Sequence, residues 1–140
     1  MQTFTEELFL KLQNISDINS FFKMHEHQFL KETTESFLNS VLELKKMSVA
    51  EIAKTSGVGE YTYKIFRGER TPSRDVLIAL AFGMGLSIEE TQLLLRISKF
   101  AVLDAREKRD SVIIFSITNG LSVFQADDLL YENNLPTING

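Results

Sequence analysis

The stretch SVAEIAKTSGVGEYTYKIFRGERTPSRD, residues 48–75, predicts two short helices joined by a tight turn, followed by the start of a third helix. Ser48 is a favourable N-cap for the first helix, and Glu51, three residues later, completes a capping box. Gly57 ends this helix, because glycine adopts the left-handed conformation of a C′ position at little steric cost.

The second helix is bounded by a glycine and a proline. It has room from about residue 59 to residue 67, because Gly68 ends it and Pro72 prevents its continuation. Ser73 then caps the third helix, and Asp75 lies in its first turn, where the helix dipole favours a carboxylate. Two short helices joined by a glycine turn are the geometry of a helix-turn-helix.

Hydrophobic spacing predicts further helices on both sides of this unit. Residues 35–46 place their apolar side chains on a helix that precedes it. Residues 73–83 are apolar nearly all round, so we expect this helix at the centre of the core. Ser87 and Glu90 form another capping box, which opens a helix that runs through Ile97. Together these segments predict a five-helix bundle.

Two more helices are predicted towards the C-terminus. The first covers residues 104–119, although its β-branched run at residues 112–114 would also suit a strand. We expect a helix, because Gly120 follows as a C′ residue and no second strand pattern is present to pair with. Ser122 and Gln125 form the capping box of the last helix.

The N-terminal segment is acidic and rich in phenylalanine. Its apolar side chains fall on one helical face: Phe4, Leu8, Phe9, Leu12 and Ile15. We expect this arm to pack across the core, and the alternative is a helix pair that binds a partner or dimerises. The expected division is therefore an arm at residues 1–33, a helix-turn-helix domain at residues 34–99 and a helical extension at residues 100–140.

Charge is distributed unevenly along the 140-residue chain, whose net charge is −4. Residues 44–75 carry seven Lys or Arg against four acidic residues, whereas residues 1–43 sum to −4 and residues 111–140 to −3. The helix-turn-helix segment is thus the only positive one. Phosphate contacts need Lys or Arg, so this asymmetry favours nucleic acid as the partner of that segment.

Composition favours a soluble, cytoplasmic protein. The chain has no cysteine, which leaves neither a disulfide framework nor thiolate chemistry. Its longest apolar run, residues 76–86, has about 11 residues, whereas a membrane-spanning helix needs about 20. No charged and then apolar leader pattern begins the sequence.

The helix-turn-helix stretch resembles the phage-repressor (Cro/CI, or XRE) type of DNA-binding domain over about residues 37–95. The residues that carry the resemblance are Ala50-Glu51-Ile52-Ala53, Ser56-Gly57-Val58, Ile65, Arg67-Gly68-Glu69-Arg70, Pro72-Ser73, Asp75 and Leu80–Ser87. The whole chain is similar to small bacterial regulators of this type with helical extensions at both ends. The resemblance implies an all-α, phage-repressor-like five-helix bundle that regulates transcription and binds double-stranded DNA as a homodimer.

The second helix of the motif presents a polar stripe with spacing i, i+3, i+4 and i+7, formed by Glu60, Tyr63, Lys64 and Arg67. In the major groove, Lys64 would donate to guanine O6 and N7 and Glu60 would accept from cytosine N4, while Tyr63 would reach a phosphate or a thymine methyl group. The resemblance implies phosphate contacts near helix N-termini and in the following loop, from Ser48, Arg70, Thr71, Ser73 and Arg74. The alternative is that the stripe is only the solvated face of a surface helix.

A protein-interaction adaptor is the competing hypothesis. Val49 stands where many members of the family place a polar residue that contacts phosphate, and Glu60 repels phosphates unless it reads a base. The segment between Gly57 and Gly68 is also one residue shorter than the common pattern of the family. On this view the arm or the acidic C-terminal helices bind a protein partner, and DNA binding is weak or lost.

The sequence offers little for catalysis. Its only histidines, His25 and His27, would face different sides of a helix, which makes a poor metal site. In an extended segment they could share a face, but no further ligand is evident. The pair Gly83 and Gly85 lacks the third glycine and the preceding strand of a nucleotide-binding loop. We therefore expect a non-enzymatic protein without a catalytic residue, a cofactor or a metal.

Overall fold

The computed structural model describes residues 33–140, and within this range the chain is entirely helical, with seven helices and no strand. The helices are α3 (Thr34–Leu44), α4 (Val49–Ser56), α5 (Tyr61–Phe66), α6 (Arg74–Gly83), α7 (Ile88–Ile97), α8 (Lys108–Thr118) and α9 (Val123–Glu132). The predicted all-α class is confirmed for this part of the chain. The arm predicted at residues 1–33 lies outside the described residues except for Thr33.

Serine caps start four of these helices at the predicted positions. The side chains of Ser48, Ser73, Ser87 and Ser122 each accept a hydrogen bond from the backbone N–H three residues later. The predicted capping boxes at Ser87 and Ser122 are complete. The one at Ser48 is not, because the Glu51 carboxylate accepts from the Ser48 hydroxyl group, at 3.2 Å, instead of from its backbone N–H.

Helices α5 and α8 begin later than predicted, and α3 covers residues 34–44 instead of 35–46. Helix α5 covers residues 61–66 instead of 59–67, since Gly59 has a φ of 71° and Glu60 and Arg67 are its caps. Helix α8 begins at residue 108 instead of 104. The N–H of Glu107 donates to the Asp104 carbonyl at 3.0 Å and closes a turn over residues 104–107, while the N–H of Asp104 donates to the Asp110 carboxylate at 3.0 Å. The β-branched run at residues 112–114 is helical, as expected.

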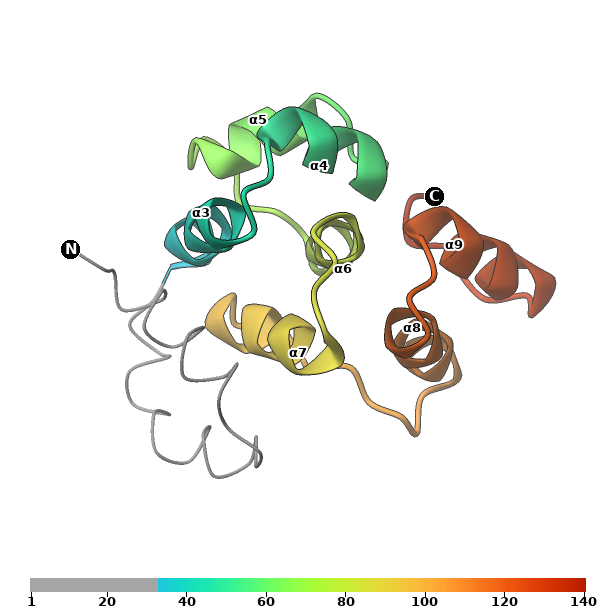
Figure 1. Ribbon diagram of the computed structural model, residues 1–140. Coiled ribbons are helices and arrows are strands. Elements are labelled where there is room, and N and C mark those ends of the chain that lie inside the picture. Colours follow the sequence, from blue (N-terminus) through green and yellow to red (C-terminus); the bar gives the residue numbers. More distant parts are fainter. Residues whose placement is uncertain (1–32) are drawn as a thin grey trace.

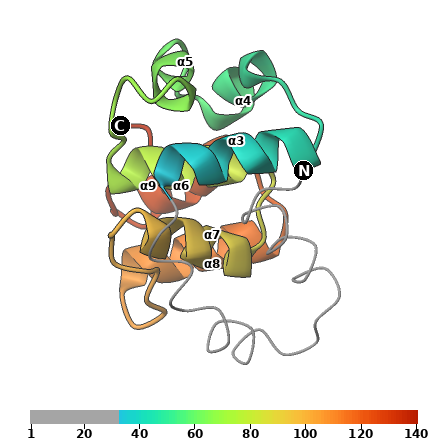
Figure 2. The same ribbon diagram turned by 90° about the vertical axis from the view of Figure 1, so that its left-hand side faces the viewer.

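Helix α6 occupies the centre of the structure, as predicted. Figure 1 shows it between α3, α4 and α5 on one side, α7 on another, and α8 and α9 on a third. The turned view in Figure 2 shows α4 and α5 together above α3, α6 and α9, with α7 and α8 below them. Residues 77–81 of α6 are fully buried, so apolar neighbours surround this helix.

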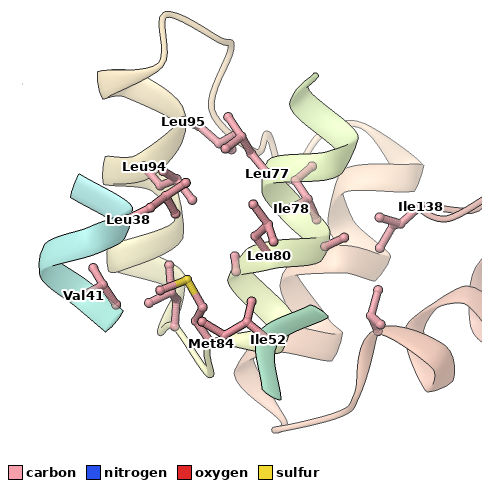
Figure 3. Close-up of a cluster of buried hydrophobic side chains, with 14 of the residues drawn as sticks. Leu38, Val41, Ile52, Leu77, Ile78, Leu80, Met84, Leu94, Leu95 and Ile138 are labelled. Carbon is pink, nitrogen blue, oxygen red and sulfur yellow. The ribbon is translucent and has the colours of Figure 1, made fainter. Parts of the chain in front are cut away.

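A single hydrophobic core joins helices α3–α7 to the C-terminal extension. Figure 3 shows side chains of α6 packed with those of α3, α4 and α7, and with Ile138 from the end of the chain. Ile113 of α8 and Leu130 of α9 belong to the same cluster. The C-terminal helices are therefore part of one packed unit with the first five helices.

Helices α4 and α6 approach closely at Gly83, the last residue of α6. A Cβ atom at this position would lie 2.8 Å from the backbone nitrogen of Ser56 and 3.0 Å from its Cα. The Thr55 hydroxyl group also donates to the Gly83 carbonyl, at 2.9 Å.

Within residues 33–140, no helix combines the length and the apolar character that crossing a membrane requires.

The close approach at Gly83 predicts how the variant Gly83→Ala changes the free energy of unfolding. The sign of the change shows whether helix propensity or steric overlap dominates. Helix propensity alone favours Gly83→Ala by up to about 1 kcal/mol. Steric overlap with Ser56 instead predicts that the variant loses about 1–3 kcal/mol in free energy of unfolding, measured by urea denaturation. Increased stability would show that α4 moves away from α6 at negligible cost.

Candidate nucleic-acid interface

Helix α5 is fixed to the rest of the structure along one side. Thr62, Ile65 and Phe66 are buried, and α5 packs against α3 and α4. The Asn39 side chain of α3 donates to the Phe66 carbonyl at 2.9 Å, which satisfies one of the carbonyls at the end of α5. The opposite side of α5 faces solvent.

The four predicted base contacts lie on or beside this outer side of α5. Glu60, Lys64 and Arg67 are exposed and Tyr63 is half-buried. Arg67 forms an ion pair with Glu69 at 3.0 Å, and both side chains are more than half exposed. Because exposed pairs of this kind contribute at most about 1 kcal/mol, Arg67 can exchange Glu69 for another anion at little cost.

Four of the five predicted phosphate contacts are exposed. Ser48 and Ser73 lie at the N-termini of α4 and α6, where each hydroxyl oxygen already accepts a backbone N–H. Arg70 and Thr71 lie in the loop between α5 and α6, and the guanidinium of Arg70 donates to the Glu69 carbonyl at 3.2 Å. All four side chains are therefore accessible to a ligand.

The fifth predicted phosphate contact, Arg74, is engaged inside the protein. Its Nε donates to the Ala101 carbonyl at 2.9 Å, and its Nη2 to the Val102 carbonyl at 3.3 Å. The guanidinium also forms an ion pair with Asp110 at 3.1 Å, and the two side chains are only 23% and 11% exposed. The structure thus places Arg74 as a link between α6 and α8.

A second ion pair joins the same two helices, with the arginine on α8 and the carboxylate on α6. Arg109 of α8 donates to both carboxylate oxygens of Asp75, at 3.0 and 3.1 Å. Adjacent residues of α6, Arg74 and Asp75, are therefore matched with adjacent residues of α8, Asp110 and Arg109. Sequence analysis missed this pairing because its members lie 34 and 36 residues apart and no local pattern connects them.

The ion pairs of Arg74 and Asp75 with α8 leave the net positive charge of residues 44–75 unchanged, because they engage one cation and one anion of this range. Apart from Arg74 and Asp75, this range carries six exposed cationic and three exposed acidic side chains. The cationic residues are Lys45, Lys46, Lys54, Lys64, Arg67 and Arg70, and the acidic ones are Glu51, Glu60 and Glu69. The excess positive charge of the segment is thus carried by exposed side chains, of which Lys45 forms an ion pair with Glu90 at 4.0 Å.

Asp104 and Arg106 form an exposed pair at 2.9 Å before α8. The pKa of Asp104 is lowered by the hydrogen bonds from the Arg106 side chain and then by the one from its backbone N–H. Residues 33–140 contain no group of three or more His, Asp or Glu side chains that could hold a metal ion. His25 and His27 lie outside this range.

Comparisons with known proteins found no relative. No protein-family model, no curated protein and no solved structure matches this chain.

The position of Arg74 predicts a role in stability. Replacing it in Arg74→Met leaves the Asp110 carboxylate buried without its cation, which should lower the free energy of unfolding by about 3 kcal/mol in urea denaturation. The matched control Arg70→Met removes the same charge from an exposed side chain and should change stability by less than about 0.5 kcal/mol. Equal stability of the two variants would show that Arg74 does not link α6 to α8.

Proposed function

We propose that this protein binds double-stranded DNA in a sequence-specific manner and regulates transcription, with α5 in the major groove. The observation that carries the proposal is the outer side of α5, where Lys64 and Arg67 are exposed while Ile65 and Phe66 anchor the opposite side in the core. An anchored helix with an exposed cationic side is what base reading in the major groove requires.

The side chains along α5 match the chemistry of base edges. Lys64 donates to guanine O6 and N7, and Arg67 is a second donor one turn further along the helix. Glu60, at the start of α5, accepts from cytosine N4, so its negative charge meets a base and not a phosphate. Tyr63 contacts a phosphate or a thymine methyl group.

Polar groups around α5 suit contacts with the DNA backbone. Ser48 and Ser73 lie at helix N-termini, where exposed backbone N–H groups favour anions. Arg70 and Thr71 follow α5 directly in the chain. Contacts of this kind fix the register of a protein on the duplex, whereas α5 supplies the sequence preference.

The resemblance to the Cro/CI or XRE family supports the same proposal. In such a protein the helices α3–α7 form the repressor-like bundle, α4 and α5 form the helix-turn-helix, and the regulator works in the cytoplasm. One short helix makes few base contacts, so binding of a homodimer to a two-fold symmetric site supplies the remaining specificity.

An adaptor that binds a protein partner is the second candidate, and one observation favours it. Phe115, Phe124 and Tyr131 on α8 and α9 are 55%, 52% and 78% exposed. Large exposed apolar side chains on neighbouring helices are typical of protein-binding surfaces. The adaptor hypothesis predicts that changes at α5 leave partner binding intact.

Binding of the purified protein to the DNA upstream of its own gene, compared with a random duplex across a salt series, tests the first proposal. We expect a preference for the upstream duplex that weakens with salt. The variant Lys64→Ala/Arg67→Ala should lower the affinity at least about tenfold, since each lost contact costs about 1 kcal/mol or more.

The control variant Lys99→Ala/Lys108→Ala removes the same charge from exposed positions outside α4 and α5. It should retain most of the affinity for the upstream duplex. If both double variants lose affinity equally, or if the protein binds the two duplexes equally well, the interaction is only electrostatic attraction without sequence preference. If the protein binds neither duplex at low salt, the adaptor becomes the leading hypothesis.

A further inference from the structure

The C-terminal strap, residues 135–139, runs back from α9 to the end of α4. Figure 1 places the C-terminus beside α9 and near the end of α4. Ile138 of the strap is 6% exposed and belongs to the hydrophobic core, as Figure 3 shows. Through Ile138 the strap is therefore packed into the hydrophobic core of the protein.

Two charged side chains hold the backbone of the strap. Asp127 of α9 accepts from the N–H groups of Ile138 and Asn139, at 2.6 and 3.1 Å. Arg109 of α8 donates to the carbonyls of Pro136 and Thr137, at 2.8 and 3.0 Å. Four charge-assisted hydrogen bonds thus fix the path of the chain up to Asn139.

Asn139 contacts the residue at which α4 ends. Its side-chain Nδ2 donates to the carbonyl of Ser56 at 2.9 Å, a bond between residues 83 positions apart. A carbonyl in the last turn of a helix has no partner within that helix, so Asn139 supplies the bond that α4 cannot form itself. Gly57, the next residue, packs against the Asn139 and Phe124 side chains, which a Cβ atom there would meet at 2.6 and 3.1 Å.

The same end of α4 determines where α5 begins. The N–H of Val58 donates to the Ser56 hydroxyl group at 3.2 Å, and the N–H of Gly59 donates to the Ala53 carbonyl at 3.1 Å. The N–H of Thr62 in α5 then donates to the Gly59 carbonyl at 3.0 Å. This chain of hydrogen bonds connects the residue held by Asn139 to the first turn of α5.

We propose that Asn139 is a positioning residue for the helix-turn-helix: it holds the turn between α4 and α5, and thereby α5, in the orientation that binds DNA. The DNA-binding part of this inference rests on the function proposed above. A recognition element must be held to within about 0.5 Å of its productive position, so a loosened turn lowers affinity even though Asn139 itself touches no base.

Amide hydrogen exchange measured by NMR tests the positioning without DNA. In Asn139→Ala we expect the protection factors of the Gly59 and Thr62 amides to fall about fivefold to tenfold, as for the loss of one net hydrogen bond. Asn139→Asp has nearly the same shape but cannot donate to the Ser56 carbonyl, so it should show at least the same loss. In both variants the affinity for the upstream duplex should fall about threefold or more.

A matched control separates this effect from general destabilisation. The Asn119 side chain donates to the Phe115 carbonyl at the end of α8, at 2.8 Å, and thus makes the same type of bond away from α4. Asn119→Ala should lower protection at Leu121, whose N–H donates to the Ser116 carbonyl, and leave Gly59 and Thr62 unchanged.

The outcomes are distinct. Unchanged protection at Gly59 and Thr62 in Asn139→Ala, wild-type behaviour of Asn139→Asp, or equal effects of the Asn119 and Asn139 changes would overturn the positioning role. Reduced protection with full DNA affinity would overturn its link to binding. If the wild-type protein binds no DNA, the proposed function fails, while the exchange experiment still decides whether Asn139 holds the turn.

Discussion

The burial of α6 is the constraint on which the rest of the structure depends. Residues 77–81 of this helix have no exposed surface, so it is stable only if other helices cover it on every side. Helices α4, α7 and α9 all pack on it, and at its end Gly83 allows the backbone of α4 to approach. The position of α4, and hence of the turn that leads to α5, follows from how α6 is covered.

The C-terminal helices complete this covering and also balance charge at its edge. Arg74 at the start of α6 loses much of its contact with water where α8 packs beside it, whereas the Asp75 side chain remains 43% exposed. The opposite charge of Asp110 compensates for that loss, and Arg109 pairs with Asp75. Arg109 also reaches the strap, so the same arginine connects the start of α6 to the segment that ends beside α4.

The side chains proposed to read bases on α5 are separate from those that hold the fold together. Lys64 and Arg67 extend from the outer side of α5, where Arg67 forms an exposed and weak ion pair with Glu69. Their replacement should therefore change binding with little change in stability. The exposed aromatic residues of α8 and α9 lie on other helices, so DNA binding and a protein partner are compatible on one molecule.

The sequence by itself determined the local features of the fold: the serine caps of α4, α6, α7 and α9, the glycine that ends α4, and the central place of α6. These could be predicted because a cap joins residues three positions apart and hydrophobic spacing repeats along a single helix. It also identified the exposed candidates on α5, since their spacing is that of one helical face. Only the tertiary structure decided that Arg74 links α6 to α8 and that Asn139 supports α4. Their partners lie 36 and 83 residues away, and which distant residues meet is set by how the helices pack around α6.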